Sequence, residues 1–159
     1  MPIISKQFKT VLGCFATGVA IVTTAVNGKI HGLTVNAFTS VSLKPPLVLI
    51  CIDTDAESCK LIKKSKIFTV NLLTDKQKNI SKKFSDPKNK ENRFDDDIWA
   101  FKAGKAPVLI NALAFIDCKV ESIFLSGDHY IFVGKVLKLG LNKNSKPLIY
   151  YRGKYSVSD

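Results

Sequence analysis

The segment 31-HGLTVNAFTSVSLKPPLVLICID-53 decides the fold, because apolar and polar residues alternate along much of its length. Successive side chains of a strand point to opposite faces. We therefore expect one apolar face that carries Leu33, Val35, Ala37, Val41 and Leu43. The opposite face would carry Thr34, Asn36, Ser40 and Ser42, with Phe38 as its apolar exception. Antiparallel sheets often leave such a polar face in water, so a wet surface and a ligand site are both open interpretations.

The flanking residues predict that this strand belongs to an antiparallel sheet. Asn27-Gly28 is the strongest short signal for a two-residue hairpin, so the β-branched run 19–26 should fold back onto residues 30–38. Pro45-Pro46 breaks the chain, and 47-LVLICID-53 has the composition of a buried strand.

The rest of the chain adds short helices and further strands. Helical spacing follows Ser5 and recurs at 56–65 and 75–84, and residues 85–97 read as an exposed polar loop. Extended segments are predicted at 67–73, 109–125, 129–141 and 147–155. About six or seven strands joined mostly by hairpins favour a mainly β fold, a small antiparallel barrel with helices outside, as one domain over residues 1–159. A Rossmann fold is excluded, because no GxGxxG motif follows a first strand.

The bulk composition is that of a folded soluble protein. Hydrophobic residues make up 46% of the 159 residues and charged residues 23%. The longest apolar runs, such as 47-LVLICI-52, are far shorter than the ~20 residues that span a bilayer. The N-terminal residues lack the pattern of a signal peptide. We therefore expect a cytoplasmic protein without a membrane anchor.

The cysteines and histidines do not predict a metal site. Cys14, Cys51, Cys59 and Cys118 stand singly in hydrophobic segments, and there are only two histidines. Zinc sites need clustered thiolate and imidazole ligands, which this spacing lacks. Buried free thiols in a reducing compartment are the simpler interpretation.

The net charge of +11 raises the question of nucleic-acid binding. Only Arg93 and Arg152 among the 24 basic residues are arginine, and arginine is the preferred reader of base edges and phosphates. Lysines between residues 60 and 90 are spread over every face of that segment. A lysine-rich surface is therefore favoured over a nucleic-acid site, and such a surface would steer anionic ligands.

Motifs for nucleophilic or phosphate chemistry are missing from the sequence. There is no GxSxG elbow and no GxxxxGK[ST] loop, and the acidic run 95-DDD-97 lies in the predicted loop. What remains is a strand face rich in hydroxyl and amide groups. Such a face suits a cofactor that carries its own chemistry, such as a flavin, as well as it suits solvent.

A succession of motifs resembles the flavin reductase-like family, whose fold is the FMN-binding split β-barrel of antiparallel, Greek-key type. The motifs are 13-GCFATGVAIVTT-24, the segment 31–53, 68-FTVNLL-73, Gln77, 127-GDH-129 and 147-PLIYYRGKY-155. They occur in order from about Phe8 to Tyr155, which is nearly the whole chain. Each motif is weak alone, but their combination and spacing are specific.

The resemblance implies a set of flavin-binding residues. Those that would line the flavin ring, its edge or the ribityl chain are Thr34, Val35, Asn36, Ala37 and Ser40. Those that would follow the ribityl–phosphate arm or bind the phosphate are Cys51, Ile52, Asp53, Ser58 and Lys60.

Further roles implied by the resemblance concern the nicotinamide and the subunit boundary. His129 would lie near the nicotinamide, although a histidine that only stabilises its turn is an equal alternative. Arg152 and Tyr151 would border the cofactor pocket of a neighbouring subunit. Phe84 and Trp99 would either shield the flavin or serve as plain hydrophobic anchors.

The function implied is that of a homodimeric NAD(P)H-dependent flavin reductase. NADH or NADPH would transfer hydride to non-covalently bound FMN or FAD, and the reduced flavin would serve a partner monooxygenase. Catalysis would come from positioning the two rings, without a catalytic nucleophile or metal. The alternatives are a non-catalytic flavin- or haem-binding protein on the same fold and, less favoured, a basic nucleic-acid-binding barrel.

Overall fold

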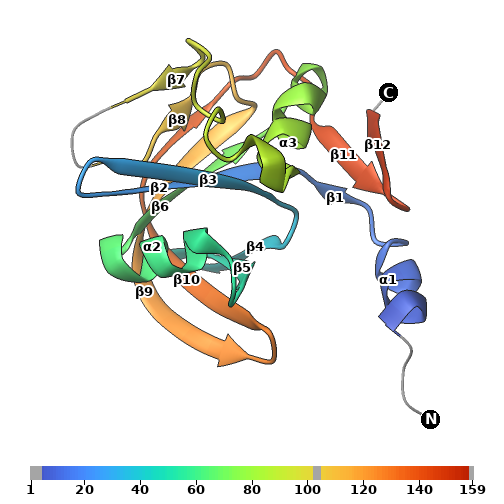
Figure 1. Cartoon of the computed structure of the whole chain (residues 1–159), viewed down its shortest axis with the longest axis horizontal. Helices are drawn as coiled ribbons and strands as arrows, with labels where there is room; N and C mark the ends of the chain where they lie inside the picture. Colours follow the sequence, from blue (N-terminus) through green and yellow to red (C-terminus); the bar gives the residue numbers. More distant parts are fainter. Residues whose placement is uncertain (1–4, 102–104, 158–159) are drawn as a thin grey trace.

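A seven-stranded antiparallel sheet forms the centre of the computed structural model, which describes residues 5–101 and 105–157 (Figure 1). The strand order is β3-β2-β6-β9-β10-β5-β4. The strands are β2 Ala20–Val26, β3 Lys29–Val35, β4 Phe38–Leu43, β5 Pro46–Asp53, β6 Ile67–Leu72, β9 Ala114–Ser126 and β10 His129–Leu141. The mainly β, antiparallel class predicted from the sequence is confirmed.

The sheet curls toward a barrel but stays open between β3 and β4. These two strands are consecutive in the chain and yet form opposite edges of the sheet. Only Asn36 and Ala37 connect them, so the two edges must come together at this connection. No ladder joins β3 to β4 in the part of the chain that the structure describes. The barrel is therefore split at Asn36-Ala37.

The single alternation predicted along residues 33–43 is wrong beyond Val35. Val35 is buried, but Val41 and Leu43 on the expected apolar face are 48% and 89% exposed. The chain turns at Asn36, whose carbonyl accepts a hydrogen bond from the N–H of Phe38. A bulge between Ser40 and Ser42 then shifts the register against β5. Each irregularity resets which side chains face the core.

The predicted hairpin at Asn27-Gly28 is confirmed, and a second hairpin of the same kind was missed. Asn27 and Gly28 both have positive φ angles, of 49° and 79°, as a two-residue turn between β2 and β3 requires. Arg152 and Gly153 repeat this geometry with φ angles of 48° and 76°. The predicted strand 147–155 is therefore two strands, β11 Leu148–Tyr151 and β12 Lys154–Val157, which form a small sheet with β1 Thr17–Gly18.

Two further segments differ from their predictions. The extended segment 109–125 is interrupted: β8 Val108–Leu109 pairs with β7 Trp99–Ala100, and β9 begins only at Ala114. The residues 85–97 contain a short helix, η2 Pro87–Asn89, and a buried arginine, Arg93. This segment is therefore partly packed against the body and is not simply an exposed loop.

The helices lie outside the sheet, as predicted. They are α1 Ser5–Leu12, α2 Glu57–Ser65, η1 Asp75–Gln77 and α3 Lys78–Ser85. A reciprocal capping box between Thr74 and Gln77 starts the η1–α3 pair. None of the helices in the described ranges is long and apolar enough to cross a membrane. In contrast to α2 and α3, α1 has no buried residue and stands away from the body (Figure 1).

The core has two parts that meet at the central sheet. The first part fills the barrel and includes Ile50, Ile62, Phe68 and Phe132, with α2 packed on it. The second part lies beneath α3 and β7 and includes Phe84, Trp99 and Leu148. Fully burying one such side chain stabilises the fold by roughly 1.5–3 kcal/mol. Both parts stabilise strands that border the split in the barrel.

Candidate functional site

Two adjoining cavities lie at the split in the barrel. Their volumes are about 230 Å³ and about 240 Å³, and both are lined by Val19, Val35 and Asn36. The other lining residues of the first cavity are mostly apolar and include Phe15, Gly18, Phe38 and Leu72. The second cavity is instead lined by the hydroxyl-bearing residues Thr34, Ser85, Tyr150 and Tyr155. Together they form a groove with an apolar arm and a hydroxyl-rich arm that meet at Asn36.

The structure brings together three of the four residues predicted to line a flavin ring. Thr34, Val35 and Asn36 line this groove, whereas Ala37 is exposed beside it. The hydroxyl of Thr34 donates to the carbonyl of Ser81 at 2.6 Å, so its hydrogen is already used within the protein. The amide of Asn36 is exposed and is the polar group that the groove offers most directly to a ligand.

The predicted residues on β4 and β5 lie beside the groove and do not line it. The N–H of Cys51 donates to the carbonyl of Ala37 at 3.1 Å, which ties the Asn36-Ala37 connection to β5. Ser40 and Asp53 are exposed, while the side chain of Ile52 is buried in the barrel core. Only the backbone of Ile52 could therefore meet a surface ligand. Burial raises the pKa of the half-buried Cys51 thiol, which keeps it neutral.

Ser58, one of the two predicted phosphate ligands, is buried. Its side chain is 2% exposed, and its hydroxyl lies 2.7 Å from Nδ1 of His31. The hydroxyl is thus engaged inside the protein, at the point where the N-terminus of α2 meets β3. Lys60, the other predicted phosphate ligand, is exposed on the surface of α2.

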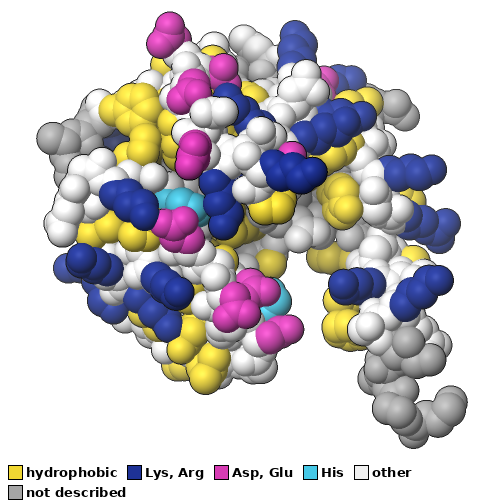
Figure 2. Space-filling model, viewed as in Figure 1, with side chains coloured by type: hydrophobic (Ala, Val, Ile, Leu, Met, Phe, Trp, Pro, Cys, Tyr) yellow, Lys and Arg dark blue, Asp and Glu magenta, His cyan; other side chains and the backbone are white. Residues whose placement is uncertain are grey.

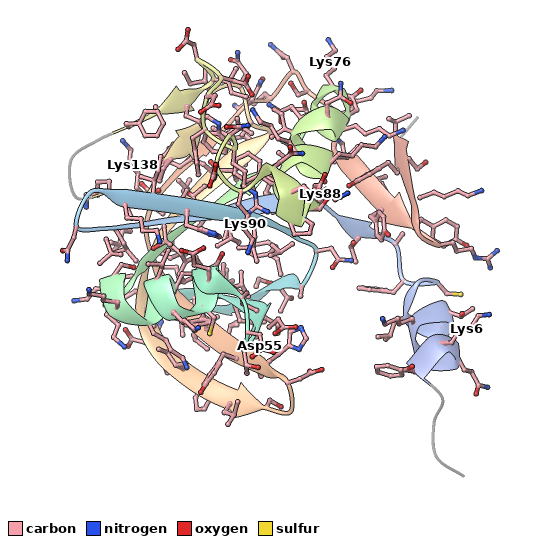
Figure 3. All side chains as sticks on the ribbon, viewed as in Figure 1. Lys6, Asp55, Lys76, Lys88, Lys90 and Lys138 are labelled. Atoms are coloured by element: carbon pink, nitrogen blue, oxygen red, sulfur yellow. The ribbon has the colours of Figure 1, made fainter. Side chains whose placement is uncertain are left out.

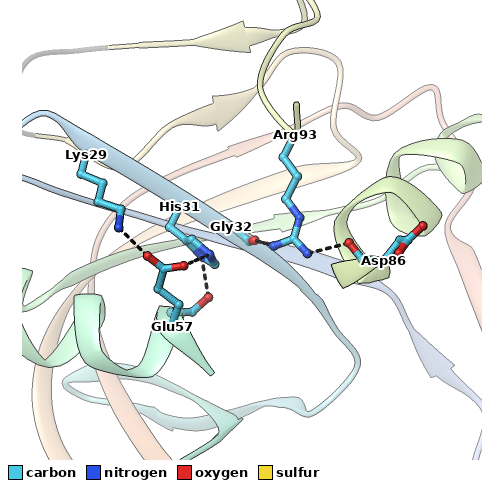
Figure 4. Close-up of polar contacts among 7 residues, drawn as sticks. Lys29, His31, Gly32, Glu57, Asp86 and Arg93 are labelled. Carbon is cyan, nitrogen blue, oxygen red and sulfur yellow. Dashed lines mark hydrogen bonds and ion pairs between the residues drawn. The ribbon is translucent and has the colours of Figure 1, made fainter. Parts of the chain in front are cut away.

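His31 belongs to a polar network within the fold (Figure 4). Glu57 forms an ion pair with Lys29 and lies 3.6 Å from Nε2 of His31. Burial lowers the pKa of His31, although the Glu57 carboxylate acts in the opposite direction. Beside this network, Arg93 donates to the carbonyls of Gly32 and Asp86 at 2.7 and 3.1 Å. These contacts hold α2 and residues 86–93 against the first half of β3.

His129 lies at the start of β10, two residues before Ile131, which pairs with Cys51 of β5. It pairs with Asp53, two residues further along β5 than Cys51. Its Nδ1 lies 2.6 Å from a carboxylate oxygen of Asp128, and its side chain is 44% exposed. That hydrogen bond lowers the pKa of Asp128. The residue predicted to meet the nicotinamide is therefore accessible, and it lies beside the C-terminal end of β5.

Arg152 does not reach the groove within one chain. It sits in the turn between β11 and β12, and its N–H donates to the carbonyl of Gly13 at 2.8 Å. With Lys6 and Lys9 of α1 it lines a separate basic cavity of about 690 Å³. Its guanidinium stacks over the ring of Tyr151 at 5.2 Å. Two other tyrosines, Tyr150 and Tyr155, line the groove instead.

Phe84 and Trp99 are hydrophobic anchors, as one of the two sequence interpretations held. Both are buried and pack with Phe94, with ring centroids 4.9–5.2 Å apart. Neither lines the groove. No cluster of three or more potential metal ligands occurs within residues 5–101 and 105–157.

Sequence reasoning missed several groove residues. These are Phe15, Thr17, Ser85, Tyr150 and Tyr155. They come from three distant parts of the chain, and only the pairing of β1 with β11 brings two of those parts together. The motifs 13–24 and 147–155 contained most of them, so the quoted motifs were a usable signal.

Comparison with known proteins decides the family. The family model of the flavin reductase like domain matches residues 12–158. This chain belongs to that family. It is 38% identical over 153 residues to the reductase subunit HsaB of a flavin-dependent monooxygenase from Rhodococcus jostii, which covers 95% of this chain and 76% of the relative. The family resemblance drawn from the sequence motifs is confirmed.

Solved structures of flavin reductases share the fold over almost the whole chain. Flavin reductase PheA2 superposes with a TM-score of 0.90 at 38% identity and covers 99% of both chains. The NADH:FAD oxidoreductase SgcE6 of Streptomyces globisporus, in complex with NAD and FAD fragments, gives a TM-score of 0.90 at 30% identity, over 98% of this chain and 96% of that one.

The groove of this family member has the chemistry that a flavin requires. Thr17 Oγ1, which lines the apolar arm, is buried without a hydrogen-bond partner. A buried polar atom without a partner is costly, so it is available to a polar edge of a bound ring. The two cavities together reach the lower part of the ~300–1,000 Å³ range of small-molecule sites. The residues present therefore fit a flavin.

Proposed function

We propose that this protein is an NAD(P)H:flavin oxidoreductase that binds FMN or FAD non-covalently at the groove around Asn36. Bound flavin supplies the redox chemistry, because it accepts a hydride and carries the electrons onward. The single observation that carries this proposal is the groove itself, with an apolar arm and a hydroxyl-rich arm meeting at an exposed amide. The names of the relatives support the same activity.

The roles of the chain's own residues are binding, orientation and exclusion of water. Val19 and Val35 give the groove an apolar floor, and Asn36 and Thr17 present hydrogen-bonding groups to the ring. Donors held in place beside a ring that gains negative charge stabilise that charge without reorganisation. His129 would orient the nicotinamide from the β5–β10 end, where it is half exposed. In this proposal, no side chain acts as a nucleophile.

We propose that the functional unit is a homodimer, because the chain presents apolar surfaces that nothing covers within residues 5–101 and 105–157. Helix α1 exposes Phe8, Val11 and Leu12, and an isolated helix of eight residues is not stable in water by itself. On the outward face of the sheet, Val133 pairs with Leu49, and Ile131 lies between Cys51 and Phe124.

A second copy on these surfaces would also complete the site. The outward face of the sheet contains Cys51 and extends to His129. The basic cavity at Arg152 is lined in part by residues of α1. Both would then lie at a boundary between subunits, where Arg152 could reach the flavin of the partner. Light scattering at micromolar concentration should give twice the mass of 17.5 kDa. A monomeric mass would contradict the dimer without affecting the hydride-transfer proposal.

The reduced flavin would serve a monooxygenase, in a cytoplasmic setting. Relatives named as reductase subunits of flavin-dependent monooxygenases support such a partner. The four free cysteines, one of them exposed on the surface, support a reducing compartment. The charge distribution does not favour nucleic-acid binding, because the Lys and Arg side chains on the face shown in Figure 2 are in separate groups, with Asp and Glu side chains among them, and form no continuous stripe. One domain over residues 1–159 would carry the activity.

A stopped-flow assay tests the proposal directly. Flavin absorbance near 450 nm should fall within about seconds when NADH or NADPH is mixed with protein and FMN or FAD, as expected for turnover near the median enzyme rate. A protein that binds flavin or haem but shows no bleaching on this timescale would support the non-catalytic alternative. Comparing the two flavins and the two nucleotides in the same assay identifies the preferred pair.

A further inference from the structure

The backbone that carries His129 is fixed firmly by its neighbours. The turn between β9 and β10 includes Gly127 in a left-handed conformation, with φ of 62°. The carbonyl of Asp128 accepts a hydrogen bond of 3.0 Å from the N–H of Thr54, which follows β5. His129 itself is in register with Asp53. The Cα position of His129 is thus set by two strands, while its half-exposed ring could still rotate.

The side chain of Asp128 fixes that ring. One carboxylate oxygen lies 2.6 Å from Nδ1 of His129. An ionised carboxylate only accepts hydrogen bonds, so Nδ1 must be the protonated nitrogen. Formation of this bond is the main cause of the lowered pKa of Asp128. The other nitrogen, Nε2, is then the one that the ring can present to a ligand.

A role in stability does not account for this pair. The side chain of Asp128 is 89% exposed, and exposed ion pairs contribute little to the free energy of unfolding. The pair does affect the orientation of the His129 ring, because a hydrogen bond at one ring nitrogen selects the tautomer and the rotation of the whole imidazole. The contact therefore acts on what His129 presents to a ligand.

We propose that Asp128 is a positioning residue, which holds His129 as the Nδ1–H tautomer so that Nε2 faces the nicotinamide. This inference rests on the proposed function, in which His129 meets the nicotinamide. It adds a second residue to the nicotinamide site and states how that residue acts, through His129 and without contact to the nucleotide.

The first test is made on the protein without nucleotide or flavin. Two-bond ¹⁵N–¹H correlation spectra distinguish the two imidazole tautomers, and His129→Gln identifies the signals of His129. We expect the Nδ1–H form to dominate in the wild type and the Nε2–H form to rise in Asp128→Ala. Asp128→Asn should keep the wild-type pattern, because its side-chain oxygen still accepts from Nδ1. An unchanged tautomer ratio in Asp128→Ala would overturn the proposal.

The second test is a double-mutant cycle on the KM for NADH with saturating flavin. Loss of one hydrogen bond predicts an increase of about threefold to tenfold for Asp128→Ala, with kcat and the KM for flavin little changed. His129→Ala should raise the KM for NADH at least as much, and the double variant should be no worse than His129→Ala alone. Additive effects, or an Asp128→Asn variant as impaired as Asp128→Ala, would show that charge matters and positioning does not.

A matched charge control lies in the same part of the molecule. Asp55 is exposed in the turn between β5 and α2 and follows Asp53, the partner of His129 (Figure 3). Asp55→Ala removes the same charge without removing a contact to His129, so it should leave the KM for NADH unchanged. If His129→Ala itself has no effect on KM, the assigned role of His129 fails; if the wild type bleaches no flavin, the proposed activity fails. The tautomer measurement separates both outcomes from failure of the Asp128 proposal.

Discussion

The first part of strand β3 and the Asn36-Ala37 connection that follows the strand differ in how their polar groups are used; we call the first the closed half and the second the open half of this region. In the closed half, His31 bonds to Ser58 and the carbonyl of Gly32 accepts from Arg93, all inside the fold. In the connection that follows β3, Asn36 and Ala37 are exposed, and Asn36 lines the groove. Polar groups that are satisfied internally fix the architecture, whereas those left open at the split are free to bind a ligand.

The first prediction concerns the hydrogen bonds that Arg93 donates to the closed half and its neighbours. Arg93→Ala should lower the free energy of unfolding by roughly 2–4 kcal/mol, because it leaves the buried carbonyl of Gly32 and the partly buried carbonyl of Asp86 without this donor. Lys88→Ala is the control, since it removes an exposed basic side chain from the same segment and should change stability by less than about 0.5 kcal/mol. Equal denaturation midpoints for the two variants would contradict the assigned role of Arg93.

The second prediction concerns space in the same half. A Cβ added at Gly32 would lie 2.8 Å from the ring of Phe84 and 3.2 Å from that of Phe94. Gly32→Ala should therefore cost roughly 1–3 kcal/mol of stability through overpacking, as measured by urea denaturation. Gly18→Ala is the control, because nothing lies within 4 Å of its added Cβ. A stable Gly32→Ala variant would mean that residues 84–94 move easily away from β3.

The third prediction tests the open half. Asn36→Leu should weaken flavin binding by about twofold to tenfold through loss of one polar contact. The free energy of unfolding should hardly change, since Asn36 is exposed. Asn144→Leu makes the same substitution at an exposed site outside the groove and should leave flavin affinity unchanged. Fluorescence titration of FMN measures the affinity of both variants. An Asn36→Leu affinity equal to that of the wild type would favour the alternative interpretation, in which this polar face only contacts water.

The same contrast explains what the sequence could predict. Local signals sufficed for the Asn27-Gly28 turn, for α2 and for the strands of the barrel, because spacing and turn chemistry are encoded over a few neighbouring residues. The alternation across residues 33–43 failed, because the turn at Asn36 and the bulge near Val41 have no counterpart in a period of two.

Long-range contacts were the other part that sequence patterns left out. The family resemblance assigned Ser58 to a phosphate, and its hydrogen-bond partner His31, 27 residues earlier, could not be read from the sequence. Arg93 lies in a polar stretch that reads as solvent-exposed, and its partner carbonyl at Gly32 is 61 residues away. Tyr155 reaches the groove only because β11 pairs with both β1 and β12. None of these pairings leaves a local trace in the chain.

The smallest expected effect is a pH dependence that belongs to the closed half alone. Burial holds the pKa of His31 below its ordinary 6.5, and Arg93 and Lys29 act in the same direction, while Glu57 opposes them. Between that lowered pKa and pH 6.5 the unfolded chain binds more protons than the folded one. Stability should therefore rise with pH through this window and be lost as the pH falls through it.

His31→Gln tests the assignment of this slope, because glutamine retains a polar side chain near Ser58 but cannot titrate. Denaturation midpoints between pH 5 and 7 should vary less in this variant than in the wild type. The carboxylate of Glu57 has a pKa lowered from 4.5, chiefly by its hydrogen bond from Lys29, so its own contribution is lost only at more acidic pH. A slope that persists unchanged in His31→Gln would place the titrating group outside the closed half and contradict the assignment to His31.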